Sequence, residues 1–373
     1  MINFRPLPTP ADTRNNIPVP STWPQGLNNH ALVLAQVTAA WDPWWADVSP
    51  GYKAAVGSYP LGIRSIAHAL HLELTNGWSF DFCLRYCEEN LMDTPGGVRA
   101  SSNIGNLTSR ARAGVDEQIA SAVTIAIAAA DGYRFLCDVQ RYTRKYPGMV
   151  SRRWKGNGPD HLVAQFGSPA NGQVATFRFL EAKGNASEFS NAKPRDFCIF
   201  KTQSLNAELL FACVVQPILS YVYLLATGAP LFAQWFNAPA RQMPKKSDRA
   251  RQAFLLLSAA KDQYVRIMWK SRRTGTKTLV GKRLWIISRD GSSGVAIDIE
   301  ARTVFKKIGD ILRSIKGAKD LEKSVEDLLK AVRALQKITK ASDNPETDVE
   351  EFAETRFEVV ARDATGFLFL RRA

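Results

Sequence analysis

The sequence predicts a protein of the α+β or α/β class, with a central mixed β-sheet flanked by helices and helical additions at both ends. Three observations predict it. Strand-like runs of alternating apolar residues lie between residues 133 and 183. An alanine- and isoleucine-rich helical run precedes them, and a long apolar run follows. Apolar stripes at helical spacing then cross residues 301–341.

The composition supports a sizeable core and two or three structural units. The chain has 373 residues, of which 45% are hydrophobic. Its five cysteines are scattered and form no Cys-x-x-Cys pair, which argues against a disulfide framework or a zinc site. No signal-peptide pattern opens the chain, so we expect a cytoplasmic protein.

Composition shifts divide the chain into four parts. Residues 1–25 form a proline-rich arm, and residues 26–100 a helical region that includes a long helical stretch from Ile63 to Leu91. Residues 101–300 hold the predicted core. Residues 301–373 hold helices and a terminal hairpin.

The core begins with a helix and three strands. Gly114 to Glu117 open a helix that covers Gln118 to Ala130, and the two acids suit a helix N-terminus. A Gly- and Pro-containing loop at 167–172 predicts a hairpin between the second and third strands. The three strand-like runs are Tyr133–Val139, His161–Phe166 and Gln173–Lys183.

The apolar run from Leu209 to Phe236 resembles a membrane span at first sight. Gln216-Pro217 interrupts it, and a span needs about 20 predominantly apolar residues, so a buried core helix is the better interpretation. We therefore expect no membrane association. The last strand of the core is either Tyr264–Trp269 or Leu284–Ser288, and the sequence does not decide between them.

The C-terminal part predicts two amphipathic helices separated by Gly317. An acidic run from Asp343 to Glu358 follows, either as a solvated linker or folded back on a basic segment. The chain closes on a β-hairpin at Phe357–Leu370, with its turn around Asp363–Gly366.

Two short motifs lie on the predicted second and third strands. Pro159-Asp160 is the only Pro-Asp pair in the chain, and Glu181-Ala182-Lys183 is the only acid followed two residues later by Lys. Strand alternation places Glu181 and Lys183 on one face, and an antiparallel hairpin would set Asp160 beside them. Two carboxylates and an ammonium group in this arrangement can bind Mg²⁺ and activate water against a phosphodiester.

These motifs resemble those of the PD-(D/E)xK nuclease superfamily, which has the restriction-endonuclease-like fold. The resemblance covers roughly residues 110–230 and indicates the superfamily, not a particular member. It implies a hydrolase acting on phosphodiester bonds, most simply a DNA endonuclease of a restriction or phage-defence (antiviral) system.

The resemblance also implies a role for each residue. Asp160, Glu181 and the backbone carbonyl of Ala182 would bind Mg²⁺ or Mn²⁺, and Lys183 would orient the attacking water or stabilise charge on the phosphate. The helix before the sheet often adds an acid in this fold. Glu117 is the candidate, although helix capping would explain it equally well. Gln203, or Lys201, would contact the scissile phosphate.

The charge of the chain predicts an anionic partner. The formal charge is +14 and the pI about 9.6, which favours nucleic acid. The basic segment 237–289 holds fourteen Lys and Arg against Asp248 and Asp262. Its predicted phosphate contacts are Lys245, Lys246, Arg249, Arg272, Arg273, Lys277, Lys282 and Arg283.

Two function classes therefore remain open. The first is the nuclease, acting on double-stranded DNA or, in a weaker interpretation, on RNA. The second is a non-catalytic nucleic-acid-binding or interaction subunit with the same basic surface. No Walker A pattern occurs, so an ATP-driven step would need a separate ATPase or helicase chain, and a homodimer is compatible with either class.

Overall fold

The structure of the protein is a computed structural model. It describes residues 2–4, 57–59, 61–73, 79–94, 97–149, 158–168, 172–185, 216–223, 231–237, 249–343, 349–352 and 355–373. The predicted proline-rich arm therefore lies outside the described residues except for Ile2–Phe4. Helices and two large sheets make a mixed α/β architecture, as the sequence predicts.

The first large sheet is mixed, and it carries the two motifs. Its strand order is β2-β1-β9-β8-β7-β6-β5. β5, β6 and β7 pair antiparallel, whereas β7 and β8 run parallel. The three predicted core strands are thus confirmed. The strands are β1 (Ile2–Phe4), β2 (Gly57–Tyr59), β5 (Phe135–Asp138), β6 (His161–Phe166), β7 (Ala175–Asn185), β8 (Gln216–Tyr223) and β9 (Phe232–Asn237).

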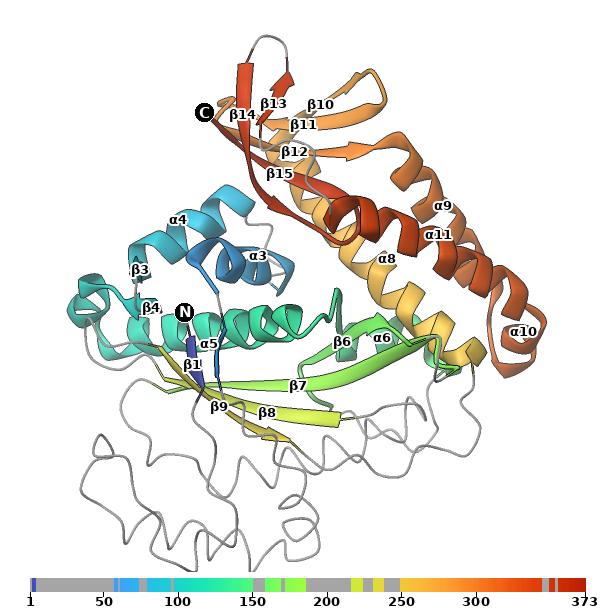
Figure 1. The fold of residues 1–373 in the computed structure, drawn as a ribbon, viewed down its shortest axis with the longest axis horizontal. Coiled ribbons are helices and arrows are strands. Elements are labelled where there is room, and N and C mark those ends of the chain that lie inside the picture. Colours follow the sequence, from blue (N-terminus) through green and yellow to red (C-terminus); the bar gives the residue numbers. More distant parts are fainter. Residues whose placement is uncertain are drawn as a thin grey trace, which may run out of the picture.

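Helix α5 (Ser109–Ala130) packs along this sheet and begins earlier than predicted (Figure 1). Thr108 is its N-cap, with Oγ1 accepting a hydrogen bond from the Ala111 N–H. The predicted start at Gly114 was wrong because Gly114 is tolerated inside the helix. Among the described residues α5 is the one helix long and apolar enough to cross a membrane, and 67% of its apolar window is buried, as in a core helix.

The predicted long helix from Ile63 to Leu91 is instead two helices, α3 (Ile63–Glu73) and α4 (Phe80–Asn90). Ser79 caps the second helix, since its Oγ accepts the Phe82 N–H at 3.1 Å. The small hairpin of β3 (Leu91–Thr94) and β4 (Gly97–Ala100) follows.

The predicted core helix over Leu209–Phe236 is wrong where the structure describes it, because β8 and β9 occupy this region. Pro217 cannot continue a helix, and aromatic and β-branched residues follow it. Neither candidate for the last core strand was right. Tyr264–Trp269 lies within α8, and Leu284–Ser288 lies in β11 of the other sheet, so β8 is the strand parallel to β7.

The second large sheet is antiparallel, with the order β10-β11-β12-β15-β14-β13. Its strands β10–β12 precede residue 300 and β13–β15 follow it. The sequence analysis had assigned these two sets of strands to different parts of the chain. The predicted terminal hairpin is confirmed, with Gly366 at φ 88° in its turn. The strands are β10 (Gly275–Val280), β11 (Arg283–Ser288), β12 (Ser293–Asp298), β13 (Val349–Phe352), β14 (Thr355–Arg362) and β15 (Phe367–Arg372).

The predicted C-terminal helices are also confirmed. They are α9 (Ile299–Ser314), α10 (Ala318–Lys323) and α11 (Val325–Asp343), and Gly317 precedes α10 as expected. Where the structure describes it, the acidic run folds back on the basic segment at Glu350. Glu350 of β13 forms an ion pair with Arg283 of β11, with 2.5 Å between Oε2 and Nη1.

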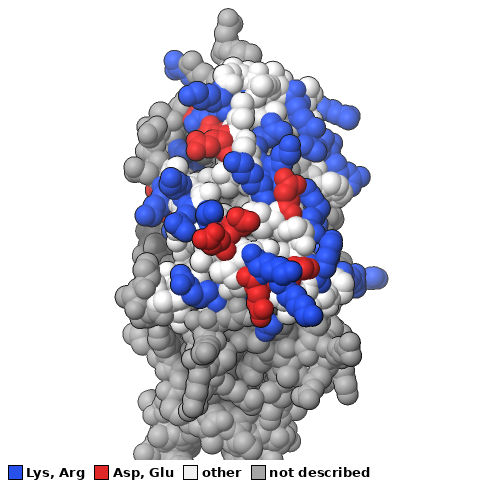
Figure 2. Space-filling view, turned by 90° about the vertical axis from the view of Figure 1, so that its right-hand side faces the viewer, with Lys and Arg blue, Asp and Glu red and all other residues white. Residues whose placement is uncertain are grey.

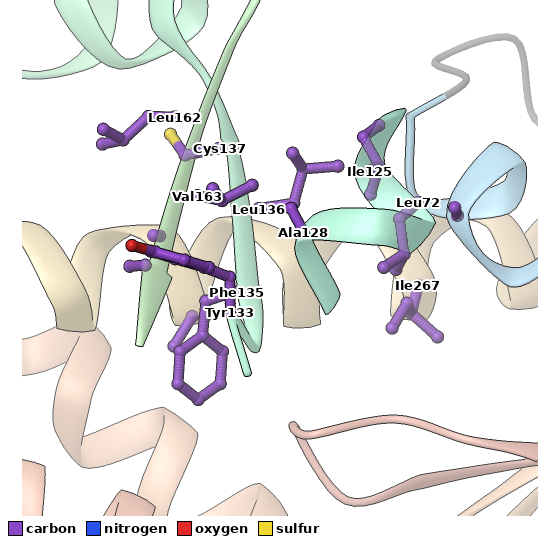
Figure 3. Packing of buried hydrophobic residues seen from close by; sticks show 14 of the residues in the cluster. Leu72, Ile125, Ala128, Tyr133, Phe135, Leu136, Cys137, Leu162, Val163 and Ile267 are labelled. Atoms are coloured by element: carbon purple, nitrogen blue, oxygen red, sulfur yellow. The ribbon is translucent and has the colours of Figure 1, made fainter. Parts of the chain in front are cut away.

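Helix α8 (Arg249–Thr274) runs between the two sheets (Figure 1). In the core beside it, Leu72 of α3 and Ile267 of α8 lie next to each other (Figure 3). Ile125 of α5, together with Phe135 and Val163 of the first sheet, belongs to the same buried hydrophobic cluster.

Candidate active site

The β6–β7 hairpin brings the two carboxylates of the motifs together. His161 pairs with Leu180 in the antiparallel register, which sets Asp160 opposite Glu181. The Asp160 backbone N–H donates a hydrogen bond to Glu181 Oε2 at 3.2 Å. The two acids are 21 positions apart in the sequence, and the β6–β7 hairpin alone is enough to bring them together.

Glu181 is buried and accepts hydrogen bonds on both oxygens. Its exposed fraction is 2%, and the Lys183 Nζ donates to its Oε1 at 2.5 Å. Both residues stand on β7 two positions apart, so strand alternation directs them to one face. The Lys183 side chain is one third exposed, which leaves the ammonium group at the edge of the solvent.

Asp160 lies at the protein surface beside this buried acid. Dense packing around its carboxyl group, together with the negative charge of Glu181, raises the pKa of Asp160 to about 7. A divalent cation beside Asp160 would favour the charged form of its carboxyl group.

His161 points away from this pair, as strand alternation predicts. It is buried, with Nε2 at 3.1 Å from Ser121 Oγ and 3.6 Å from Glu73 Oε1. Burial lowers the pKa of His161, but the hydrogen bond and charge of Glu73 outweigh it and raise the pKa. The histidine therefore joins α3 and α5 to the sheet.

The helix acid that packs on β7 is Asp116, not the predicted Glu117. Glu117 is exposed and lies about two turns inside α5, so helix capping does not explain it. Asp116 is buried, and a β-carbon on Gly184 would stand 2.3 Å from its backbone oxygen. Burial raises the pKa of Asp116 to about 6. Thr108, a good N-cap residue, was the available sequence signal for where α5 begins.

Several predicted contacts are not brought together or lie elsewhere. Gln203, Lys245 and Lys246 lie outside the described residues. Ala182 stands between Glu181 and Lys183 on β7, half-buried. Within the part of the chain that the structure describes, no three His, Cys, Asp or Glu side chains form a ready metal-binding group. The described site thus offers two carboxylates, a number that suits an ion that keeps several waters.

The predicted basic contacts do not form one surface. Arg249 lies at one end of α8, and Arg272 and Arg273 lie at the other, about 35 Å away along the helix. Lys277 is exposed on β10 just after the second end, and Lys282 is exposed in the turn at the far end of the β10–β11 hairpin. Arg283 instead pairs with Asp298 and Glu350.

Other cations of the basic segment are structural. Arg266 is buried and donates to the carbonyl oxygens of Leu72 and Leu136 at 2.8 and 2.9 Å. Lys270 is buried and donates to the His71 carbonyl. Part of the positive charge of residues 237–289 therefore serves to anchor α8 to the elements around it.

A second group of cations, which the C-terminal helices expose, was not predicted from the sequence. Figure 2 shows the face to which these helices belong, where Lys and Arg side chains are spread with fewer Asp and Glu between them. The helical period of residues 301–341 is visible in the sequence. A total charge counted along the chain, however, does not show which face of a helix carries the charged side chains. These exposed cations are Lys306, Lys307, Arg313, Lys319, Lys323, Lys330, Arg333, Lys337 and Lys340.

Comparison with known proteins returned no family. No family model, curated protein or solved structure matches this chain significantly.

Proposed function

We propose that the protein is a metal-dependent nuclease whose active site is Asp160, Glu181 and Lys183. The observation that carries this proposal is the contact of all three residues around Glu181, through Asp160 N–H to Oε2 and Lys183 Nζ to Oε1. The β6–β7 hairpin is enough to bring these three residues together, and the contact needs no other pairing of distant segments. The restriction-endonuclease-like core is part of the same proposal.

The order of elements supports this core. Helix α5 is followed by the antiparallel β5, β6 and β7, and then by β8 parallel to β7. A parallel connection needs a crossover, and residues 186–215, outside the described part, are long enough for one.

Asp160 and Glu181 would hold Mg²⁺ or Mn²⁺, together with the carbonyl of Ala182. The fit rests on the donor set, because both carboxyl groups are hard oxygen donors. The pKa of Asp160 is raised first by burial and then by the negative charge of Glu181, and a cation would offset that charge. When bound, the ion would supply an activated water and neutralise charge on the phosphate.

Lys183 would act on the same water or on the developing charge of the phosphate. Its ammonium group contacts Glu181 and reaches the solvent edge, so a small rotation can present it to a substrate there. Gln203 would contact the scissile phosphate. The substrate is DNA in this proposal, cut internally in the cytoplasm by a restriction or antiviral defence enzyme, alone, as a homodimer or with an ATPase chain.

Cleavage of supercoiled plasmid, linear duplex and RNA side by side in Mg²⁺ tests this function. We expect Asp160→Asn, Glu181→Gln and Lys183→Ala each to lower the cleavage rate at least about 100-fold, because each removes a metal ligand or the group that acts on the water. Glu322→Gln, which changes an exposed acid on α10, should cut like the wild type. Equal rates for Glu181→Gln and Glu322→Gln would overturn the site.

The second function, a non-catalytic binding subunit, is favoured by one observation. On the face in Figure 2, exposed Lys and Arg side chains outnumber the Asp and Glu side chains that lie among them. If the wild type binds duplex DNA with strong salt dependence and cuts none of the three substrates in Mg²⁺ or Mn²⁺, this second function replaces the first.

A further inference from the structure

A cationic pocket lies apart from the carboxylate pair, where α8, α9 and the segment after α6 (Val139–Lys145) meet. Its volume is about 400 Å³, and Tyr146, Met149, Leu312 and Ile315 form apolar parts of its wall. Four cations complete the lining, namely Lys145, Lys261, Arg313 and Lys316. No acid is among its described lining residues.

The packing fixes two of these cations at one point of α9. Gly309 has no side chain, and the position of a β-carbon there would lie 3.3 Å from Lys261 Nζ and 3.5 Å from Arg313 Nη1. One hydrogen of the Lys261 ammonium is used on the Phe305 carbonyl at 2.8 Å. The two charged groups therefore lie within about 7 Å of each other, so different oxygens of one phosphate group can reach both.

The electrostatics of the pocket favour an anion. Burial, together with the positive charges of Lys145 and Arg313, lowers the pKa of Lys261 to about 8, while Asp310 acts in the opposite direction. Asp310 pairs with Arg313, but both side chains are more than half exposed, so this pair is weak. An anion in the pocket would offset the repulsion of Lys261 by Lys145 and Arg313.

We propose that this pocket binds a phosphate group, held by Lys261 and Arg313 with Lys145 and Lys316 at its rim. Two sources share this chemistry: a phosphate of a nucleic-acid backbone and a free phosphate or nucleotide. Binding requires no cleavage, so the inference is independent of the proposed nuclease.

The pocket lies at a distance from the carboxylates that one nucleic-acid strand can cover. Helix α6 starts at Val139, whose N–H donates to the Asp160 carbonyl at 3.3 Å, and it ends at Lys145. Seven helical residues span about 10 Å. A backbone phosphate bound in the pocket would therefore lie a few nucleotides from Asp160.

Isothermal titration of the full chain without divalent ions tests the pocket. The probes are inorganic phosphate, pyrophosphate, a nucleoside triphosphate and a short single-stranded oligonucleotide. We expect saturable binding of at least one probe, weakened about 10-fold or more in Arg313→Gln and in Lys261→Gln, since each removes a charge-assisted hydrogen bond to the anion. Lys307→Gln is the matched control, since Lys307 is exposed on the same helix but does not line the pocket.

The outcomes separate the two sources. Weaker oligonucleotide binding alone assigns the pocket to a backbone phosphate, and weaker phosphate or triphosphate binding alone assigns it to a free ligand. Equal affinities in Arg313→Gln, Lys261→Gln and Lys307→Gln, or no saturable binding of any probe, would overturn the proposal. If Lys261→Gln does not keep the wild-type circular dichroism spectrum, Lys145→Gln, at the exposed rim, replaces it.

Discussion

At the scale of single residues, the candidate site is defined by one buried acid and its two partners. Glu181 is 2% exposed, so its charge must be met by protein groups, and the Asp160 N–H and the Lys183 ammonium meet it. The carboxyl group of Asp160 then has an acid beside it, and its pKa rises because its own packing and this negative charge outweigh the nearby cations.

The raised pKa of Asp160 predicts a pH-dependent stability. The folded state binds the Asp160 proton more tightly than the unfolded chain does. The stabilisation that comes from protonated Asp160 is therefore lost as the pH rises from about 4 to about 7. Asp160→Asn removes this titration. We expect the variant to gain about 1 kcal/mol over the wild type at pH 8 and little at pH 4, a value kept small because Asp160 is exposed.

Urea unfolding of both proteins from pH 4 to pH 8 measures this difference. His161 also has a raised pKa, which comes chiefly from the hydrogen bond and charge of Glu73 acting against burial, so most of its titration is common to both proteins. The charge of Asp160 adds a smaller contribution to that raised pKa, which the variant loses. A gain that does not change with pH would show that Asp160 titrates at its ordinary pKa.

In the wild type, divalent ions should offset the loss of stability that charged Asp160 causes at pH 8. An ion bound by Asp160 and Glu181 stabilises the folded state by about 2.7 kcal/mol at 100 times its Kd. We expect Mg²⁺ or Ca²⁺ to raise the melting temperature of the wild type at pH 8 and to leave Glu181→Gln unchanged. This readout needs no nucleic acid, so a protein that binds the ion without cutting would still respond.

At the scale of elements, the site depends on how α5 lies against β7. Asp116 and Gly184 approach so closely that a β-carbon on Gly184 would overlap the Asp116 carbonyl. Gly184 follows Lys183 directly, so the same contact holds the end of the strand that carries the site. A glycine is needed here for close approach of two backbones.

Gly184→Ala should therefore lower the free energy of unfolding by about 1–3 kcal/mol, as overpacking does. Gly114→Ala on α5 is the matched control, because nothing lies within 4 Å of its added β-carbon. It should stabilise the helix by up to about 1 kcal/mol. Denaturant unfolding compares the two, and variants of equal stability would contradict the close packing of α5 on β7.

At the scale of the whole molecule, α8 connects the two large sheets through buried amide groups. Gln263 accepts the Leu136 N–H of β5 at 2.8 Å and donates to Asp363 Oδ2, in the turn of the terminal hairpin, at 2.7 Å. Gln252, nearer the start of α8, accepts the Val174 N–H at 2.9 Å. Through these two amide groups, α8 holds β5 and the residue before β7 on the side of the first sheet, and the turn of the terminal hairpin in the second sheet.

Hydrogen exchange distinguishes these two glutamines. Gln263→Leu leaves a buried N–H and a buried carboxylate without this partner, at a cost of about 1–3 kcal/mol. We expect faster exchange at Leu136 and in the 363–366 turn. Gln252→Leu should affect Val174 and leave the turn unchanged. If both variants exchange alike in the turn, α8 does not couple the two sheets in this way.

The distribution of charge over the molecule predicts how nucleic acid binds. Arg272 and Arg273 are exposed at the end of α8, and Arg273 stacks on Trp269 at 4.8 Å. Their joint replacement by Ala should reduce the slope of log affinity against log salt by about one for each phosphate that the side chains neutralise. Replacing Arg266 should instead unfold the protein, because it is a buried anchor. An unchanged slope would show that Arg272 and Arg273 neutralise no phosphate.

The sequence by itself determined the local features. Strand alternation and the loop at 167–172 were enough to set Asp160 beside Glu181, because a hairpin closes that contact over a short stretch of chain. Helical stripes likewise located α9 and α11, and the Asp-Ala-Thr-Gly turn located the last hairpin.

Only the tertiary structure decided the features that depend on residues far apart in the sequence, namely which strands are neighbours and which cations are buried. It placed β8 beside β7, joined β12 to β15 across the C-terminal helices, and buried Arg266 and Lys270. It also gathered Lys145, Lys261, Arg313 and Lys316 around one pocket. The physical reason is that alternation and helical period report which face of an element is apolar, whereas the partner of that face is chosen by packing and charge across the whole chain.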